Sequence, residues 1–230
     1  MTAQARLTTS RRALILWWAA TAFASIAATL MIAAPAQAAV PAPALDAAFQ
    51  SFQRASASND TATIEAVAEQ FARLSAADPA DPVLLAYGGA AIAMRANTTA
   101  LPWRKLSFAD EGLAQVDKAL TMLNAGHDTP LHRGIAASLD TRFVAATTFL
   151  RMPAMLNRLA RGARLLDEVL QSPLFAGAPV GFRAAVWMRA ADEATKDKRN
   201  DEARQWLNLV AASGASQAAS AQAKLKELAP

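Results

Sequence analysis

The chain of 230 residues contains no cysteine, which excludes disulfides, thiolate metal sites, a cysteine nucleophile and a lipoprotein anchor. Most of its formal net charge of +4 comes from three arginines near the N-terminus. Without Arg6, Arg11 and Arg12, the 23 lysines and arginines fall to 20, against 19 acidic residues. A body so close to neutral lacks the positive charge of a nucleic-acid-binding protein, so no nucleic-acid partner is expected.

The start of the chain has the three features of an export signal. Two adjacent arginines precede an uncharged run whose apolar centre is Leu14–Ala34, and the small-residue sequence Ala36-Gln37-Ala38 follows. A basic start, an apolar run and a small-x-small site are typical of a cleaved secretory signal. The sequence therefore predicts a signal peptide over residues 1–38, a spacer over residues 39–44, and export of the remaining chain to the periplasm.

The length of the apolar run leaves a second possibility open. Residues 13–34 are 22 residues long, which is enough for a helix to span a bilayer core of about 30 Å. An uncleaved leader would anchor the protein in the inner membrane with its body facing the periplasm, and membrane contact would be limited to residues 13–34. Ser10–Ile15 also resembles a twin-arginine signal, so the general secretory and twin-arginine routes both stay open.

From residue 45 onward, apolar residues recur every three or four positions, as they do in amphipathic helices. Helices are expected from Leu45, from Thr61 to about Asp78, from Pro82 to about Arg95, and from Ser107 to Leu123. We expect Asp81 to cap the third of these helices and Ser107 the fourth, with Pro102–Leu106 as the loop between them.

The same pattern continues in the second half of the chain. A fifth helix is expected to open at Thr129–Pro130 and to end at Met152–Pro153. Further helices are expected over Leu156–Leu170, Val180–Asp197, Ala203–Val210 and Ser216–Leu228. No stretch alternates apolar and polar residues for long enough to predict a strand, so the expected fold class is all-α.

Prolines separate the expected helices into pairs. Pro79, Pro130 and Pro173 follow the second, fourth and sixth helices, at intervals of 51 and 43 residues. Helix pairs at a regular interval are typical of a solenoid, in which each pair buries its apolar face against the next pair.

Short residue patterns recur within these pairs. Gly88 follows Leu84 by one helical turn, Lys118-Ala119-Leu120 closes the paired helix, and Asp201-Glu202-Ala203 is followed by Val210. These patterns resemble those of the tetratricopeptide repeat (TPR).

The resemblance to TPR proteins covers about residues 81–210, although the spacing departs from the usual repeat of about 34 residues. It implies that residues 45–230 form antiparallel helix pairs stacked as a right-handed α-solenoid. It also implies a module for binding or assembly and not one that carries out a reaction.

Few side chains are suited to metal binding or catalysis. The two histidines, His127 and His132, could in principle bind a metal together with Asp128, but a loop position and a helix N-terminus also account for them. Gly88-Gly89 lies within a helix pattern, unlike the glycines of a dinucleotide-binding turn. No metal, cofactor or catalytic residue is therefore predicted, and a hydrolase that uses carboxylates alone is kept as an alternative.

Arginines are the only charged residues between Thr141 and Leu166. They are Arg142, Arg151, Arg158, Arg161 and Arg164. The last three cover about 120° of one face of the expected sixth helix, and such a strip suits a carboxylate, a phosphate or an anionic lipid headgroup. The alternative is a solvated face that is partly paired with acids of the adjacent helix.

A tryptophan beside two cations is a second candidate for recognition. Trp103 lies between Pro102 and two cations, and in a loop its indole could anchor a partner. The alternative is that the indole closes the end of a helix pair. The partner-binding candidates are Trp103, Arg104, Arg151, Arg158, Arg161 and Arg164.

The sequence therefore predicts a non-catalytic, exported helical-repeat protein that mediates protein or peptide binding, or assembly, in the cell envelope. One alternative is a membrane-anchored accessory subunit of an envelope transport or assembly complex. Another is an envelope hydrolase that uses carboxylates.

Overall fold

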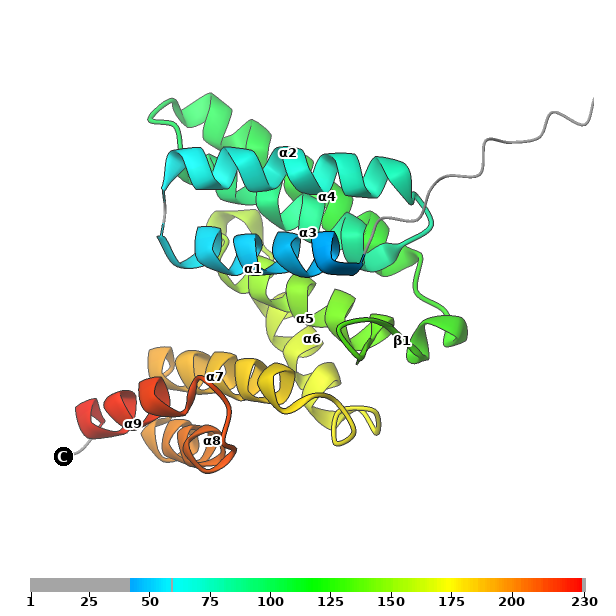
Figure 1. Cartoon of the computed structure of the whole chain (residues 1–230). Helices are drawn as coiled ribbons and strands as arrows, with labels where there is room; N and C mark the ends of the chain where they lie inside the picture. Colours follow the sequence, from blue (N-terminus) through cyan, green and yellow to red (C-terminus); the bar gives the residue numbers. More distant parts are fainter. Residues whose placement is uncertain (1–41, 59, 229–230) are drawn as a thin grey trace, which may run out of the picture. The chain divides into compact units, whose positions relative to one another are not determined.

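The computed structural model describes residues 42–58 and 60–228. The predicted signal peptide over residues 1–38, and the alternative anchor within it, lie outside the described residues. Within the two described ranges the chain is mostly helical, as predicted, with nine α-helices and one short hairpin (Figure 1). None of these helices is both long enough and apolar enough to span a membrane.

The elements follow one another in a simple order. The α-helices are α1 (Ala42–Ser58), α2 (Thr61–Ala77), α3 (Pro82–Met94), α4 (Pro102–Thr121), α5 (Ala137–Leu150), α6 (Leu159–Gln171), α7 (Val180–Lys196), α8 (Asn200–Ala212) and α9 (Ala218–Glu227). Short 3₁₀ turns are η1 (Arg95–Asn97), η2 (Ala125–Asp128) and η3 (Ala154–Leu156). Strand β1 (Pro130–His132) pairs antiparallel with β2 (Ile135–Ala136). Helix α1 thus begins three residues before the predicted start at Leu45.

Aspartates cap two of the first three helices. The Asp60 carboxylate accepts hydrogen bonds from the Thr63 hydroxyl and from the Thr63 backbone N–H, the latter at 2.8 Å, and both lower the pKa of Asp60. Asp81 Oδ1 accepts from the backbone N–H groups of Val83 and Leu84 at 2.8 and 3.1 Å. The predicted cap of the third helix is therefore confirmed, because these bonds satisfy donors that have no partner within the helix.

Helix α4 begins at Pro102, so the predicted cap at Ser107 is wrong. Proline suits the first turn of a helix, since its φ is already helical and its missing N–H is not needed there. The backbone N–H of Lys105 donates to the carbonyl of Leu101 at 3.0 Å, which continues the helix through the segment predicted as a loop. Trp103 and Leu106 consequently lie on one helical turn.

A hairpin replaces the predicted start of the fifth helix, and the prediction that the chain has no strand is wrong at this point. His132 pairs with Ile135 across a two-residue turn, and both turn residues, Arg133 and Gly134, have positive φ, at 51° and 70°. Two positive φ values define a type I′ turn, which matches the twist of paired strands. Helix α5 therefore starts only at Ala137.

Helix α6 also starts later than predicted. Asn157 adopts a left-handed conformation with φ of 52°, which ends η3 and separates it from α6 at Leu159. Asparagine tolerates this conformation better than most residues. Arg158 thus precedes the helix and does not lie on its face.

Helix α3 is buried on nearly all sides and contacts α1, α2, α4 and α5. Its closest neighbour is α4, where two glycines face each other. A Cβ atom added at Gly112 would lie 2.4 Å from the Gly89 carbonyl oxygen, and one added at Gly89 would lie 2.6 Å from that of Gly112. Only glycine at both positions allows the two backbones to approach this closely.

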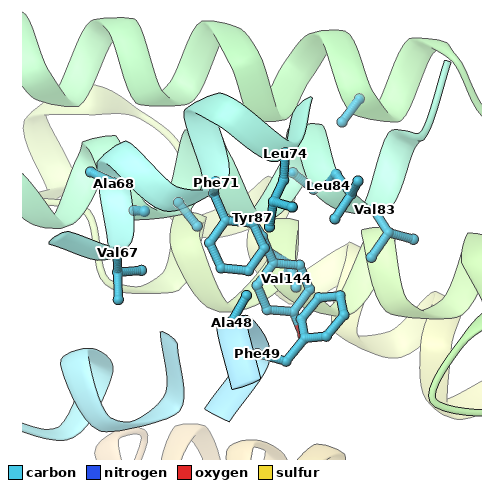
Figure 2. Close-up of a cluster of buried hydrophobic side chains, with 14 of the residues drawn as sticks. Ala48, Phe49, Val67, Ala68, Phe71, Leu74, Val83, Leu84, Tyr87 and Val144 are labelled. Carbon is cyan, nitrogen blue, oxygen red and sulfur yellow. The ribbon is translucent and has the colours of Figure 1, made fainter. Parts of the chain in front are cut away.

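The buried apolar side chains form three clusters along the chain. The first joins α1, α2 and α3 to α5, and Figure 2 shows Phe49, Phe71 and Tyr87 converging in it with Val144. The second joins α4 to α7, and the third joins α7 to α9. Helices α4, α5 and α7 each contribute residues to two clusters, so the core is continuous from one helix group to the next.

We predict that Gly112→Ala lowers the free energy of unfolding by about 2–3 kcal/mol, because the new methyl group would push α4 away from α3. Thermal or denaturant unfolding followed by circular dichroism measures the change. The matched control is Gly181→Ala, because Gly181 also lies in a helix but has no atom within 4 Å of an added Cβ. The control should be neutral or stabilising by up to about 1 kcal/mol, and equal losses for both variants would contradict the steric argument.

Candidate binding groove

An open groove of about 1370 Å³ is lined by α1, α3, the first half of α4, α5 and α7, together with the loop that contains η3. Aromatic side chains from four of these helices contribute to its wall, namely Phe52, Tyr87, Trp103 and Phe143. Most of the remaining lining residues are alanine, methionine, valine and leucine. The groove is therefore mainly apolar, as ligand-binding concavities usually are.

Three large apolar side chains at this groove are exposed to solvent. Trp103 and Leu106 on α4 are 67% and 46% exposed, and Met155 in η3 is 80% exposed. Trp103 thus lies open on the first turn of α4 and does not close a helix pair. Exposed apolar side chains that gather at one concavity are typical of an interaction surface.

A cation at the end of α5 lines the groove without an ionic partner. Arg151, at the end of α5, has no acidic side chain within 4 Å among the described residues. Partial burial and the nearby charge of Arg189 lower the pKa of Arg151, while the charge of Asp192 opposes this change. Asp192 and Arg189 are themselves engaged, because Lys224 pairs with Asp192 and Glu193 lies 3.4 Å from Arg189.

A polar atom lies one helical turn before this arginine. The Thr147 hydroxyl oxygen is buried, lines the groove and has no hydrogen-bond partner in the described part of the chain. Residues four apart lie on the same face of a helix. Thr147 and Arg151 therefore lie on the same side of the end of α5.

The β-hairpin fixes the helices that form this wall. From the tip of the hairpin, the Arg133 guanidinium lies 3.7 Å from the centre of the Phe49 ring in α1. It donates hydrogen bonds to the Tyr87 hydroxyl of α3 at 2.9 Å and to the Asp140 carboxylate of α5. Tyr87 in turn donates to Asp140 at 3.2 Å. One side chain thus connects α1, α3 and α5.

Burial governs the protonation of this network. Asp140 is 1% exposed; burial raises the pKa of its carboxyl group, and the charge of Arg133 opposes that rise. Burial also raises the pKa of the Tyr87 hydroxyl, with Asp140 adding to the effect. Tyr87 therefore keeps its proton at neutral pH and acts as a hydrogen-bond donor.

The neighbouring hairpin residue makes a second buried contact. His132 Nε2 lies 2.5 Å from Oδ2 of Asp81, the residue that caps α3. The hairpin is therefore attached to both the start of α3 and the first half of α5. Sequence patterns did not indicate the contact between His132 and Asp81, since the two residues are 51 positions apart.

The predicted arginine strip is divided between two roles. Arg158 and Arg161 both pair with Asp117 of α4, Arg158 at 2.9 Å, and both guanidinium groups lie over the Phe149 ring at 5.4 and 5.2 Å. Pairing with an acid of a neighbouring helix was one of the two possibilities for this strip. These arginines connect α4 with α5 and α6.

The other candidates lie apart from this pair. Arg164 is exposed and lines a second pocket of about 400 Å³ together with Arg142 and Arg161. Arg104 is exposed on α4 and does not line the groove. Of the six residues predicted from sequence, the structure brings Trp103 and Arg151 together in the groove.

Sequence reasoning missed three groove residues. Leu106 was assigned to a loop, but with α4 starting at Pro102 it follows Trp103 by three positions, the spacing of one helical face. Met155 lies in η3, a turn that the sequence did not predict. Thr147 gave no signal, because a threonine within a helix is usually solvated or bonded to its own backbone.

The histidines do not gather into a metal site. His127 Nδ1 accepts a hydrogen bond from the backbone N–H of Asn124 within η2, and His132 is engaged by Asp81. Over residues 42–58 and 60–228, no three histidine, aspartate or glutamate side chains lie close enough together to hold a metal ion.

No family model, curated protein or solved structure matches the chain. Function therefore has to be inferred from the geometry of the groove.

We predict that Arg133→Ala lowers the free energy of unfolding by about 3–5 kcal/mol at neutral pH, because Asp140 would be left buried without its counter-charge. Denaturant unfolding measures this loss. The control is Arg73→Ala, which removes an exposed pair with Glu69 at 3.8 Å and should cost less than about 0.5 kcal/mol.

The loss should also depend on pH. Arg133 is the main group that opposes the effect of burial, so without it the pKa of Asp140 in the folded state should rise further above its unfolded value. A raised carboxyl pKa gives stability that is present at low pH and lost as pH rises through the folded pKa. The deficit of the variant should thus be smaller at about pH 5 than at about pH 7.5, and equal deficits would contradict this account.

Arg158→Glu should destabilise the fold by about 1–2 kcal/mol, because it replaces an ion pair and a cation–π contact with repulsion from Asp117. Thermal unfolding of the purified protein measures the change. Arg164→Glu introduces the same charge at an exposed position and should shift stability by no more than about 0.5 kcal/mol. A similar loss in both variants would show that net charge, and not the Asp117 contact, is responsible.

Proposed function

We propose that the protein is a non-catalytic, exported TPR-like helical-repeat protein that binds a segment of a partner protein or a peptide in its groove, within the cell envelope. The observation that carries the proposal is the cluster of Trp103, Leu106 and Met155, which are exposed at a concave and mainly apolar surface. A monomeric protein gains no stability from such exposure, whereas a partner that covers these side chains removes them from water.

The arrangement of the helices supports a solenoid with an inner binding face. Helices α1, α3, α5 and α7 all line the groove, as does the first half of α4, whereas α2, α6 and α8 contribute no lining residue. The first helix of each successive pair thus faces the same concavity, and α4 adds the second helix of its pair; concave faces built from successive pairs are how solenoids form extended binding surfaces. The sharing of α5 and α7 between core clusters fits the same arrangement, because each helix pair depends on its neighbour.

The composition of the groove supports binding and not hydrolysis. Asp192 is the one carboxylate among the described lining residues, and it is paired with Lys224. Hydrolysis by carboxylates alone generally requires two acids that face each other across the substrate. A side-chain set of aromatic, aliphatic and cationic groups is better suited to holding a ligand.

We predict that a photo-crosslinking amino acid at position 155 gives a discrete adduct with a partner in cells that express the full-length chain. Leu106→Asp should reduce the adduct at least about tenfold, because a buried charge on the groove wall opposes apolar contact. Immunoblotting measures the yield, and mass spectrometry of the adduct identifies the partner.

The matched control is Leu209→Asp. Leu209 on α8 is 45% exposed, nearly the same as Leu106 at 46%, but it does not line the groove. This change should leave the adduct unaffected. The proposal is overturned if position 155 gives no adduct, or if both aspartate variants reduce it equally.

A further inference from the structure

We infer that the groove takes an amphipathic helix of about three turns whose acidic side chain is received by Arg151. This inference rests on the proposed function and specifies the partner by its conformation and its charge. It follows from the size of the groove, the character of its lining and the cations left without an ionic partner.

The size of the groove fits a helical segment. A helix with its side chains is about 10 Å across and rises about 1.5 Å per residue, so about ten residues occupy roughly 1200 Å³. The groove encloses about 1370 Å³. Single small ligands generally occupy pockets of about 300–1,000 Å³, so one such molecule would leave much of this surface uncovered.

The lining favours a helix over an extended peptide. An extended peptide must find partners for its backbone N–H and C=O groups, which it usually does at the open edge of a sheet. All of the described lining residues lie on helices, on 3₁₀ turns or in the connections next to them, and no strand contributes. A helix satisfies its own backbone and needs only apolar contacts from the groove.

The apolar contacts are placed for the face of a helix. Trp103 and Leu106 stand three residues apart on α4, and Met155 projects from the loop that follows α5. Tryptophan provides a large and rigid contact area, whereas methionine is flexible and adapts to irregular partners. These residues suit apolar side chains at positions i, i+3 or i+4, and i+7 of the bound helix.

The positive charge of the groove favours an acidic side chain on the partner. Arg151 and Lys105 line the groove without an ion pair among the described residues, whereas Asp192 is neutralised by Lys224. A carboxylate of the partner can accept bonds from the Arg151 guanidinium, and bonds between charged groups are stronger than neutral ones.

The test is a selection of peptides against the groove. The full-length chain is purified and immobilised, and random 16-residue peptides displayed on phage are selected for binding. The enriched peptides should carry apolar residues at helical spacing and an aspartate or glutamate, and should become helical on binding, as measured by circular dichroism. Leu106→Asp should abolish their capture.

Charge exchange then tests the role of Arg151. Arg151→Glu should weaken binding of an enriched peptide by at least about tenfold, and changing the peptide's acid to lysine should restore most of the loss. Arg164→Glu, a charge reversal outside the groove, should leave the affinity unchanged. Binding is measured by fluorescence anisotropy at constant salt concentration.

Each other outcome overturns a defined part of the argument. Enriched peptides that depend on Leu106 but lack an acid, or bind without becoming helical, overturn this inference and leave the proposed function standing. Failure to enrich any peptide that depends on Leu106 overturns both. Self-association of the chain that is lost in Leu106→Asp would identify a second copy as the occupant and would also overturn the inference.

Discussion

The contact between Arg133 and Asp140 is the interaction on which the arrangement of the groove helices depends. It places a charged side chain from a tight turn among helices α1, α3 and α5, where the Phe49 ring, the Tyr87 hydroxyl and the Asp140 carboxylate surround it. A buried ion pair adds little net stability compared with apolar packing, but it is costly to break. The pair therefore fixes the relative position of three groove helices more than it adds to stability. The same contacts hold Arg133 in its positive-φ conformation.

Close backbone packing complements this ionic contact. The opposed glycines Gly89 and Gly112 bring α4 against α3, and α4 carries Trp103 and Leu106 at its first turn. The helix that presents the exposed apolar side chains is thus held by steric fit, and the helix that carries Arg151 is held by charge. Both constraints meet in α3, which has almost no exposed surface of its own. A groove with walls fixed in this way loses little conformational entropy when it binds a ligand.

The sequence was sufficient to predict the mostly helical class and most helix positions, because periodic apolar residues, prolines and the Asp81 cap are local signals. It failed where local signals competed or were absent. Pro102 and Ser107 can both start a helix, and the fixed φ of proline prevailed. The dipeptide Arg133-Gly134 indicates a type I′ turn less strongly than asparagine–glycine does. Contacts of Arg133 with other parts of the chain stabilise the turn. The groove combines side chains from five helices, so only tertiary packing brings them together, and periodicity could indicate Trp103 and Arg151 as candidates without joining them.

The division of the core into linked clusters affects the order in which the helices unfold. The third cluster, formed by α7, α8 and α9, shares only α7 with the rest of the core. In chains where each unit is stabilised by packing against its neighbour, the terminal units unfold locally at lower free energy than the central ones. The C-terminal helices should therefore exchange their amide hydrogens before α3 does. Because α7 also lines the groove, a bound segment would hold this end of the molecule closed, so occupancy and the order of the C-terminal helices would rise and fall together.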